Sequence, residues 1–378
     1  MTAGANHPSL PPGLVREALA SVDVYEPGRP IEDVRRETGV ASIIKLASNE
    51  GPFPPMPAAL DAIRRTAADA RLYPDPGAWA LRDAIAGRTG LHPEQILPGA
   101  GIDGLIKQLC LALLEPGDEL AMAWPSFLSY TIGAAIQGAT ARLADLRPDG
   151  SYDLDALAAL VGPRTKIVVV VSPNNPTGGV ISAAELTAFL DGLPPHVLPV
   201  VDEAYFEFGA PGAHDSAALV REGRFVAGMR TFSKAYGLAG LRVGYCMAPP
   251  ALIKTLGIVR NVFDVTATAQ AAAVASLADA DEHLPPRMAL NASERAITAE
   301  GLRALGLSPL PSEANFLLMD LGSAERAGAL NAALLGRGVI VRPTRAFGAP
   351  SCIRVTIGHP EENARMLTAM AESLAELT

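Results

Sequence analysis

Short, continuously apolar segments that each end in a polar motif recur along the middle of the chain, and this pattern constrains the fold most strongly. Residues 166–172 read KIVVVVS, a β-branched run typical of strands that are covered on both faces. Residues 182–185 (SAAE) then form a capping box, which predicts the start of a helix. Residues 197–201, 225–229 and 242–247 are further strand candidates. Repeated strand and helix units of this kind predict an α/β fold with a mostly parallel sheet.

The flanking regions predict a glycine turn with a helix, and a second, smaller unit. Residues 99–101 (GAG) lead into an apolar-periodic segment, 102–114, that stops at a Glu-Pro-Gly sequence. From about residue 285 onward, helical stretches alternate with short strand candidates at 315–319, 339–341 and 353–357. A chain of 378 residues is long enough for two hydrophobic cores, so we expect two domains.

Composition excludes several classes of function. The formal net charge is -9 and no run of lysine or arginine is present, so a nucleic-acid surface has no electrostatic basis. The best candidate for a membrane span, residues 265–280, is interrupted by threonine, glutamine and aspartate, and we expect no membrane association. Residues 1–13 lack the pattern of a signal peptide and are predicted to be a flexible arm. Three isolated cysteines, without metal-ligand spacing, favour a cytoplasmic protein with no metal site.

Polar motifs follow three successive strand candidates at the point where each strand ends. These motifs are 172–178 (SPNNPTG), 202–205 (DEAY) and 231–234 (TFSK). Each alone has an ordinary structural explanation as a turn or a helix cap. Because ligands of open α/β sheets bind at the carboxyl ends of the strands, the three motifs together predict one ligand site. Lys234 has the surroundings expected of an amine that condenses with an aldehyde, since small residues, two hydroxyls and Arg242 lie close to it in sequence.

This set of groups matches the needs of pyridoxal 5'-phosphate. That cofactor requires a lysine for a Schiff base, an acid at the ring nitrogen, donors to the ring hydroxyl and a cradle for the phosphate. In these motifs the chain resembles the fold-type I pyridoxal-phosphate aminotransferases, and within them the histidinol-phosphate aminotransferase family. The resemblance covers nearly the whole chain and is carried by residues 25–30 (YEPGRP), 45–50 (KLASNE), 71–75 (RLYPD), 230–245, 353–358 and 360–363.

The resemblance implies a domain organisation. It predicts an aspartate aminotransferase-like architecture, in which a three-layer α/β/α large domain with a mostly parallel sheet is joined to a smaller α/β domain. We assign residues 49–255 to the large, cofactor-binding domain, and residues 14–48 together with 256–378 to the small domain.

The resemblance also implies roles for the residues of the cofactor site. Lys234 would form the Schiff base and move the proton, and Asp202 would pair with the pyridine nitrogen and keep it protonated. Tyr205 would donate to the ring hydroxyl oxygen and join these two as a catalytic residue. The remaining cofactor-binding residues would be Asn175 on the same oxygen, Phe127 stacked on the ring, and Thr231, Ser233, Arg242 and the backbone of Gly101, Ile102 and Asp103 around the phosphate.

The substrate side and the assembly are implied in the same way. Arg354 matches the arginine that binds the substrate α-carboxylate. Tyr25 and Arg342 match positions that meet the substrate phosphate, and Asn49 lies in the motif that lines the substrate pocket. Tyr73 matches a tyrosine that reaches the cofactor phosphate of the neighbouring subunit, which implies a homodimer with shared sites.

The implied reaction is transamination between a small-molecule amino donor and a 2-oxo acid, with histidinol phosphate and 2-oxoglutarate as the favoured pair. An aromatic amino acid aminotransferase remains an alternative, because those enzymes carry similar segments around Arg342 and at residues 124–127. A pyridoxal-phosphate decarboxylase or lyase is the alternative from another class. Two departures from the family pattern, Gly104 in place of an acidic residue and Gly51 in place of asparagine or threonine, affect the mouth of the pocket.

Overall fold

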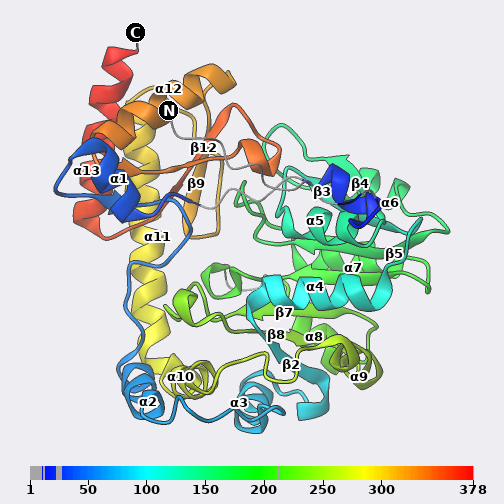
Figure 1. Cartoon of the computed structure of the whole chain (residues 1–378). Helices are drawn as coiled ribbons and strands as arrows, with labels where there is room; N and C mark the ends of the chain where they lie inside the picture. Colours follow the sequence, from blue (N-terminus) through cyan, green and yellow to red (C-terminus); the bar gives the residue numbers. More distant parts are fainter. Residues whose placement is uncertain (1–10, 12, 23–27, 211–212, 378) are drawn as a thin grey trace.

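The computed structural model describes residue 11 and residues 13–22, 28–210 and 213–377. A large sheet with helices on both faces forms one part of the molecule, and a smaller unit lies beside it (Figure 1). The long helix α11 (Ala280–Ala304) runs from α10 at one end of the molecule to the smaller unit at the other. The predicted N-terminal arm lies, apart from residues 11 and 13, outside the described residues, and so does Tyr25.

Seven strands of the described chain form the central sheet, in the order β2-β8-β7-β6-β5-β3-β4. Strand β8 runs antiparallel to both of its neighbours, whereas the other adjacent pairs are parallel, so the predicted mostly parallel sheet is confirmed. The bounds are β2 (Ile96–Gly99), β3 (Glu119–Trp124), β4 (Thr140–Asp145), β5 (Thr165–Val171), β6 (Leu198–Asp202), β7 (Ala227–Thr231) and β8 (Gly244–Met247).

Strand β5 is buried on both faces, as its continuous β-branched sequence predicts. Val168 and Val170 belong to one hydrophobic cluster, and Val169 and Val171 to the other, because successive side chains of a strand point to opposite faces. One face is covered by α4 (Gly101–Leu113), α5 (Ser129–Ile136) and α9 (Pro250–Val259). Helices packed in the other cluster are α2 (Pro57–Ala67), α3 (Trp79–Thr89), α6 (Leu154–Ala159), α7 (Ala183–Asp191), α8 (Ser216–Arg221) and α10 (Ala267–Ala278).

The helix starts follow local sequence signals. Helix α7 begins at the predicted capping box, in which the Glu185 backbone N–H donates to Ser182 Oγ at 3.2 Å and the Ser182 backbone N–H donates to Glu185 Oε2 at 2.9 Å. Helix α4 follows the glycine turn predicted at residues 99–101. None of the described helices is long and apolar enough to cross a membrane.

The smaller unit is formed by segments from near both ends of the chain, which pack around a separate hydrophobic core. It contains the antiparallel strands β11 (Arg342–Pro343), β12 (Cys352–Thr356) and β9 (Phe316–Asp320), and the parallel pair β1 (Ile44–Lys45) and β10 (Val339–Ile340). Its helices are α1 (Ile31–Thr38), α12 (Ala324–Gly336) and α13 (Pro360–Glu376). Five 3-10 turns complete the described elements: Glu17–Ser21, Pro93–Gln95, Phe206–Phe208, Ala239–Leu241 and Arg345–Phe347.

Packing differs from the predicted domain boundary at residue 256. Helix α10 lies beyond that boundary, yet its Ala269 and Ala273 belong to the same hydrophobic cluster as residues of α3. The hydrophobic cluster of the smaller unit contains residues of α11 only from Ala299 onward. We therefore propose that the large domain continues into α11, to about Leu284, while the other predicted boundaries stay predictions.

Candidate active site

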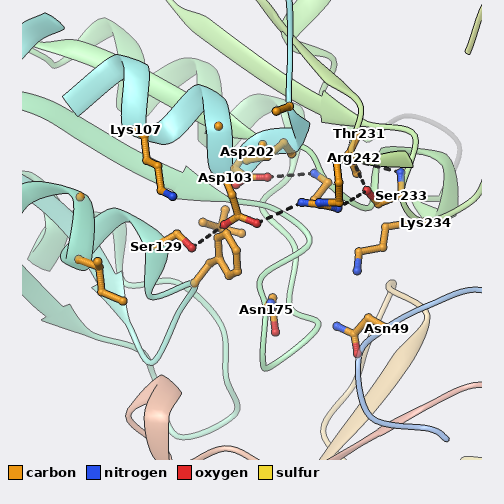
Figure 2. A pocket seen from close by; sticks show the side chains of 18 of the residues that line it. Asn49, Asp103, Lys107, Ser129, Asn175, Asp202, Thr231, Ser233, Lys234 and Arg242 are labelled. Atoms are coloured by element: carbon orange, nitrogen blue, oxygen red, sulfur yellow. Dashed lines mark hydrogen bonds and ion pairs between the residues drawn. The ribbon is translucent and has the colours of Figure 1, made fainter. Parts of the chain in front are cut away.

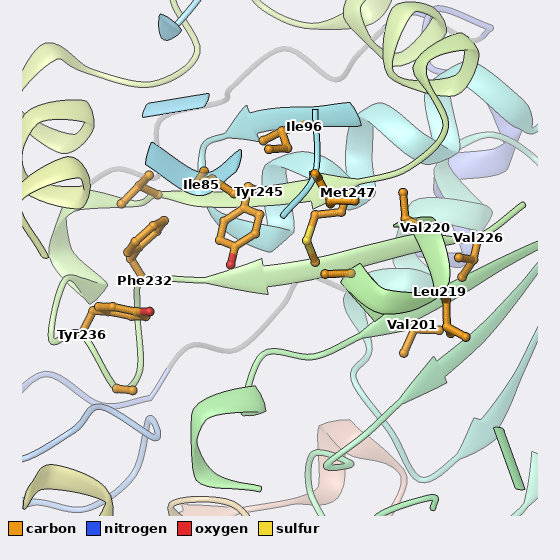
Figure 3. Close-up of a cluster of buried hydrophobic side chains, with 14 of the residues drawn as sticks. Ile85, Ile96, Val201, Leu219, Val220, Val226, Phe232, Tyr236, Tyr245 and Met247 are labelled. Carbon is orange, nitrogen blue, oxygen red and sulfur yellow. The ribbon is translucent and has the colours of Figure 1, made fainter. Parts of the chain in front are cut away.

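The residues around Lys234 form one loop that is closed at its base by two strands. Thr231 at the end of β7 pairs with Gly244 at the start of β8, and the Phe232 backbone N–H donates to the Val243 carbonyl at 3.1 Å. Behind the loop, Phe232 packs against Tyr236 and Tyr245, with ring centroids 4.9 and 5.7 Å away (Figure 3). A rigid aromatic support therefore holds the loop that carries Lys234.

The Lys234 ammonium group lies in a cavity at the carboxyl ends of the parallel strands. Its Nζ donates to the Ser48 carbonyl at 3.2 Å and lies 5.7 Å from the centre of the Tyr205 ring. Burial, together with the positive charge of Arg354, lowers the pKa of Lys234 to about 8. A substantial fraction of this amine is therefore neutral near physiological pH, as nucleophilic chemistry requires.

Asp202 occupies the last position of β6, where it is fully enclosed. Its Oδ1 accepts from the Ala204 backbone N–H at 3.1 Å, and its Oδ2 accepts from the Tyr130 hydroxyl at 2.9 Å. Burial outweighs the opposing effect of these two donors and raises the pKa of Asp202 to about 7. These two donors therefore fix the orientation of the carboxylate, and a cation brought close to it would lower its pKa.

A cradle of hydroxyls, backbone amides and one guanidinium lies at the start of α4. Thr231 Oγ1 donates to Ser233 Oγ at 3.0 Å, and Arg242 Nη1 donates to Ser233 Oγ at 3.4 Å. Gly101 has φ +71°, and a Cβ there would lie 2.8 Å from Arg242 Nη2. Arg242 also lies 3.4 Å from Asp103 Oδ2 (Figure 2). A helix N-terminus with a nearby arginine suits an anion such as a phosphate.

Hydrogen bonds join residues of the two units beside Lys234. Asn49 Nδ2 donates to the Tyr205 hydroxyl at 2.8 Å, and the Asn49 backbone N–H donates to Thr356 Oγ1 at 3.0 Å. Arg354 of β12 donates to Asn175 Oδ1 and to the Ala47 carbonyl. Asn49, predicted to be on the substrate side, thus directly contacts Tyr205, which was predicted to bind the cofactor.

Arg342 and Arg354 form a pair of cations on one wall. They are directly opposite in the β11–β12 register, both are buried, and both line the cavity. The Cζ atom of each lies 5.4 Å from the centre of the Phe347 ring. Two buried guanidinium groups give this wall a positive charge that suits an anionic ligand.

Most of the predicted site residues line the same cavity, which has a volume of about 950 Å³. Gly101 is not in the lining, although a Cβ there would lie 2.8 Å from Arg242 Nη2, and Arg242 does line the cavity. Tyr73 lies apart and is 81% exposed, with its ring stacked on Phe263 at 4.3 Å. The predicted residues in the lining are Asn49, Ile102, Asp103, Phe127, Asn175, Asp202, Tyr205, Thr231, Ser233, Lys234, Arg242, Arg342 and Arg354.

Sequence reasoning missed several residues of the site. Tyr130 reaches Asp202 from α5, the Phe347 ring centre lies 5.4 Å from the Cζ atoms of both arginines, and Ser48 contacts Lys234 through its carbonyl. Tyr130 follows Phe127 by three positions, but Phe127 precedes α5, so helical spacing does not relate the two. The other two carry no local pattern, because their contacts cross between distant segments.

Both departures from the family pattern lie near the site. A Cβ at Gly104 would lie 3.2 Å from Ala100 Cβ, and one at Gly51 would lie 3.2 Å from the Lys234 carbonyl. At each position the neighbouring atoms would have to shift by a few tenths of an ångström to admit a larger residue.

The similarity to known proteins covers this whole arrangement. The family model for aminotransferase class I and II matches residues 41–370. The histidinol-phosphate aminotransferase of Anaeromyxobacter sp. (strain Fw109-5) is 44% identical over 96% of this chain and 99% of its own length. That of Moorella thermoacetica is 42% identical over 95% of this chain and 93% of its own.

Solved structures give the same result. The histidinol-phosphate aminotransferase from Sinorhizobium meliloti, in complex with pyridoxal-5'-phosphate, superposes with a TM-score of 0.87 at 31% identity, over 97% of this chain and 99% of that one. A Thermus thermophilus aspartate aminotransferase mutant has a TM-score of 0.82 at 26% identity, over 95% of this chain and 99% of that one. Both units of the fold, and not the central sheet alone, are therefore shared.

Proposed function

The chain belongs to the aminotransferase class I and II family, and from this premise we propose that it transfers the amino group of histidinol phosphate to 2-oxoglutarate. It is an aminotransferase, and its cofactor is pyridoxal 5'-phosphate. The observation that carries the choice of substrate is the pair of buried arginines, Arg342 and Arg354, in the same cavity as Lys234.

The residues present fit the cofactor. Gly101 has φ +71°, and a Cβ there would lie 2.8 Å from Arg242 Nη2, so glycine leaves the start of α4 open to a phosphate without displacing the arginine. Asp202 is an enclosed carboxylate that gains a partner if a protonated ring nitrogen approaches it. When bound, the cofactor supplies an electron sink for the bond that breaks at the substrate carbon.

Side chains of this protein would carry out the proton transfer and hold the cofactor. Lys234, with its pKa lowered to about 8, accepts and returns the proton of the substrate's amine-bearing carbon. Asp202 would keep a proton on the ring nitrogen of the bound cofactor, and Phe127 would pack against the ring. Tyr205 and Asn175 would donate to the ring hydroxyl oxygen. Because Asn49 Nδ2 already donates to the Tyr205 oxygen, the tyrosine keeps its own proton for this donation.

Both substrates require the cationic wall. Histidinol phosphate carries a phosphate ester near its amine-bearing carbon and no carboxylate, whereas the 2-oxo acid carries carboxylates. Arg342 and Arg354 present planar donors suited to either anion. We propose that Arg354 binds the anionic group nearest the reacting carbon, and that Arg342, with Tyr25, favours the phosphate.

We further propose a homodimer and a cytoplasmic location. Tyr73 and Phe263 form an exposed stacked pair, and Trp79, Ile258 and Val262 are also exposed, at 58%, 79% and 65%. Apolar side chains of this size gather on surfaces that another subunit covers. Cys110, Cys246 and Cys352 are buried and unpaired, in keeping with a reducing compartment.

The decisive experiment is a half-reaction titration of the cofactor-loaded enzyme. The cofactor absorbance is followed with histidinol phosphate, phenylalanine, tyrosine and aspartate in parallel, in the wild type and in Arg342→Gln. We expect histidinol phosphate to be preferred, and the variant to lose on the order of 10- to 100-fold of that donor's specificity constant, the worth of one charge-assisted hydrogen bond.

The matched control is Arg345→Gln, since Arg345 is exposed, near Arg342 in sequence and absent from the cavity lining. This variant should behave as the wild type. A preference for phenylalanine that survives Arg342→Gln would instead identify an aromatic amino acid aminotransferase. Loss of carbon dioxide from the donor would identify a decarboxylase.

A further inference from the structure

Tyr130 makes a contact that none of the assigned roles explains. Its side chain is fully buried on α5, and its hydroxyl lies 2.9 Å from Asp202 Oδ2 and 3.6 Å from Met229 Sδ. A buried tyrosine usually needs a partner for its hydroxyl. This one is directed at the carboxylate that faces the cofactor's ring nitrogen in the proposed function.

The direction of the hydrogen bond follows from the two groups. An ionised carboxylate can only accept, and burial together with the charge of Asp202 holds the pKa of Tyr130 well above its ordinary value. The tyrosine is therefore the donor whenever Asp202 is ionised. The sulfur of Met229 is a weak acceptor and does not compete with the carboxylate.

The two oxygens of Asp202 are occupied in different ways. Oδ1 accepts from the Ala204 backbone N–H, which no substitution at a side chain removes, and Oδ2 accepts from Tyr130. Asp103 and Glu203 oppose the negative charge of Asp202 through their own charges. Tyr130 is thus the one side-chain donor to Asp202 that the described residues provide.

The position of Tyr130 also ties it to the ring-stacking residue. Phe127, which lies two residues before α5, and Tyr130, in the first turn of α5, make an edge-to-face contact with centroids 6.4 Å apart. A displacement of this short segment would therefore move the stacking ring and the donor to Asp202 together.

We propose that Tyr130 is a positioning residue that fixes the carboxylate of Asp202 toward the cavity and keeps the negative charge on it, so that the proton of the pair stays on the cofactor's ring nitrogen. The inference rests on the proposed cofactor chemistry and adds a residue that does not touch the cofactor. Without the hydroxyl, the proton moves toward Asp202 and the ring becomes a poorer electron sink.

The test compares Tyr130→Phe with Tyr152→Phe. Tyr152 is also buried, and its hydroxyl bonds to the Val171 backbone at 2.8 and 2.9 Å instead of to Asp202, so it controls for the loss of a buried hydroxyl. Holoenzymes carrying cofactor labelled with ¹⁵N in the ring are titrated with pH, and the ¹⁵N shift reports protonation of the nitrogen.

We expect the ring nitrogen of Tyr130→Phe to lose its proton at a pH at least about one unit lower than in the wild type, with kcat reduced about tenfold or more and KM little changed. Tyr152→Phe should keep the wild-type titration. Identical titrations in both variants would overturn the inference. A wild type without any bound-cofactor signal would instead refute the proposed function.

A double-mutant cycle guards against a merely structural effect. If Tyr130 acts through Asp202, Tyr130→Phe should change cofactor affinity in the wild type and leave it unchanged in an Asp202→Asn background. If Tyr130→Phe alone does not fold, recovery of folding in the double variant supports the inference, since the buried charge is then the cause. Failure of both proteins to fold would show a packing role and overturn it.

Discussion

At the scale of single residues, burial moves two ionisable groups toward neutrality from opposite directions. It raises the pKa of Asp202 to about 7 and lowers that of Lys234 to about 8. The unpaired charged form is disfavoured in each case, since a low-dielectric site penalises either sign of charge. A partner provided by the cofactor lowers the free-energy cost of the charged form of each group. The site alone therefore disfavours charges that the bound cofactor would stabilise.

The lowered pKa of Lys234 predicts the pH dependence of cofactor capture by the cofactor-free protein. Only the neutral amine condenses with an aldehyde, so the capture rate should rise about tenfold per pH unit below 8 and level off above it. Stopped-flow absorbance gives this profile. A midpoint near the ordinary lysine value would contradict it. Arg354→Gln removes a nearby positive charge and should move the midpoint to higher pH.

Residue roles could be predicted from sequence where one motif follows one strand. Lys234, Asp202 and Asn175 each stand at or just beyond the end of a strand, and the cavity brings all three together. Tyr130 was missed because its hydroxyl reaches Asp202 across 72 positions of sequence. Side-chain contacts of that range depend on the packing of α5 on the sheet, which no local pattern encodes.

At the scale of elements, the start of α4 depends on a backbone that only glycine supplies without strain. Gly101→Ala meets two obstacles, the positive φ of +71° and the contact of a Cβ with Arg242 at 2.8 Å. We expect cofactor affinity to fall about tenfold or more, and the free energy of unfolding to fall by about 1 kcal/mol. Equilibrium dialysis and denaturant unfolding measure the two effects.

Gly39→Ala is the matched control for this substitution. Gly39 has the same φ of +71° after α1, and a Cβ there meets nothing within 4 Å. It should lose similar stability and keep full cofactor affinity. Equal affinities for the two variants would mean that Arg242 moves aside, and that the contact at Gly101 does not control the cradle.

Elements differ in how well the sequence predicts them, for physical reasons. The β-branched run of β5 leaves no alternative to a doubly covered strand. Strand β4, which reads TARLAD, lies at the edge of the sheet and is largely exposed, so it carries no apolar run. Strand β3 reads ELAMAW, and its alanines have weak strand propensity. Neither was predicted, because tertiary packing decides both.

At the scale of the whole molecule, the site is built from both units. Lys234 and Asp202 come from the large sheet, Arg342 and Arg354 from the smaller one, and Asn49 bonds to groups of each. In the proposed dimer, each site would also contain a residue from the other subunit, because Tyr73 of one subunit would lie beside the cofactor of the other. Sequence resemblance suggests this sharing, whereas a single chain shows only that Tyr73 is exposed.

Mixing two impaired variants tests whether sites are shared. Lys234→Ala and Tyr73→Ala should each be impaired, the first completely. After the subunits are unfolded, mixed and refolded together, heterodimers contain one site with both Lys234 and Tyr73 intact, and activity should recover to about a quarter of wild type. Recovery is measured against each protein refolded alone. No gain on mixing would show that each chain completes its own site.

The loop between Thr231 and Gly244 has one more consequence, for insertions and deletions. Lys234 and Arg242 lie within one segment whose ends are joined by strand pairing, so their separation is set by the number of residues between them. An added residue lengthens the path by up to about 3.5 Å, more than a hydrogen bond. The sheet could absorb that change, but a small ligand held at both points could not. Loop length here should therefore be as invariant as the identity of the lysine, whereas loops that carry only one contact are free to vary.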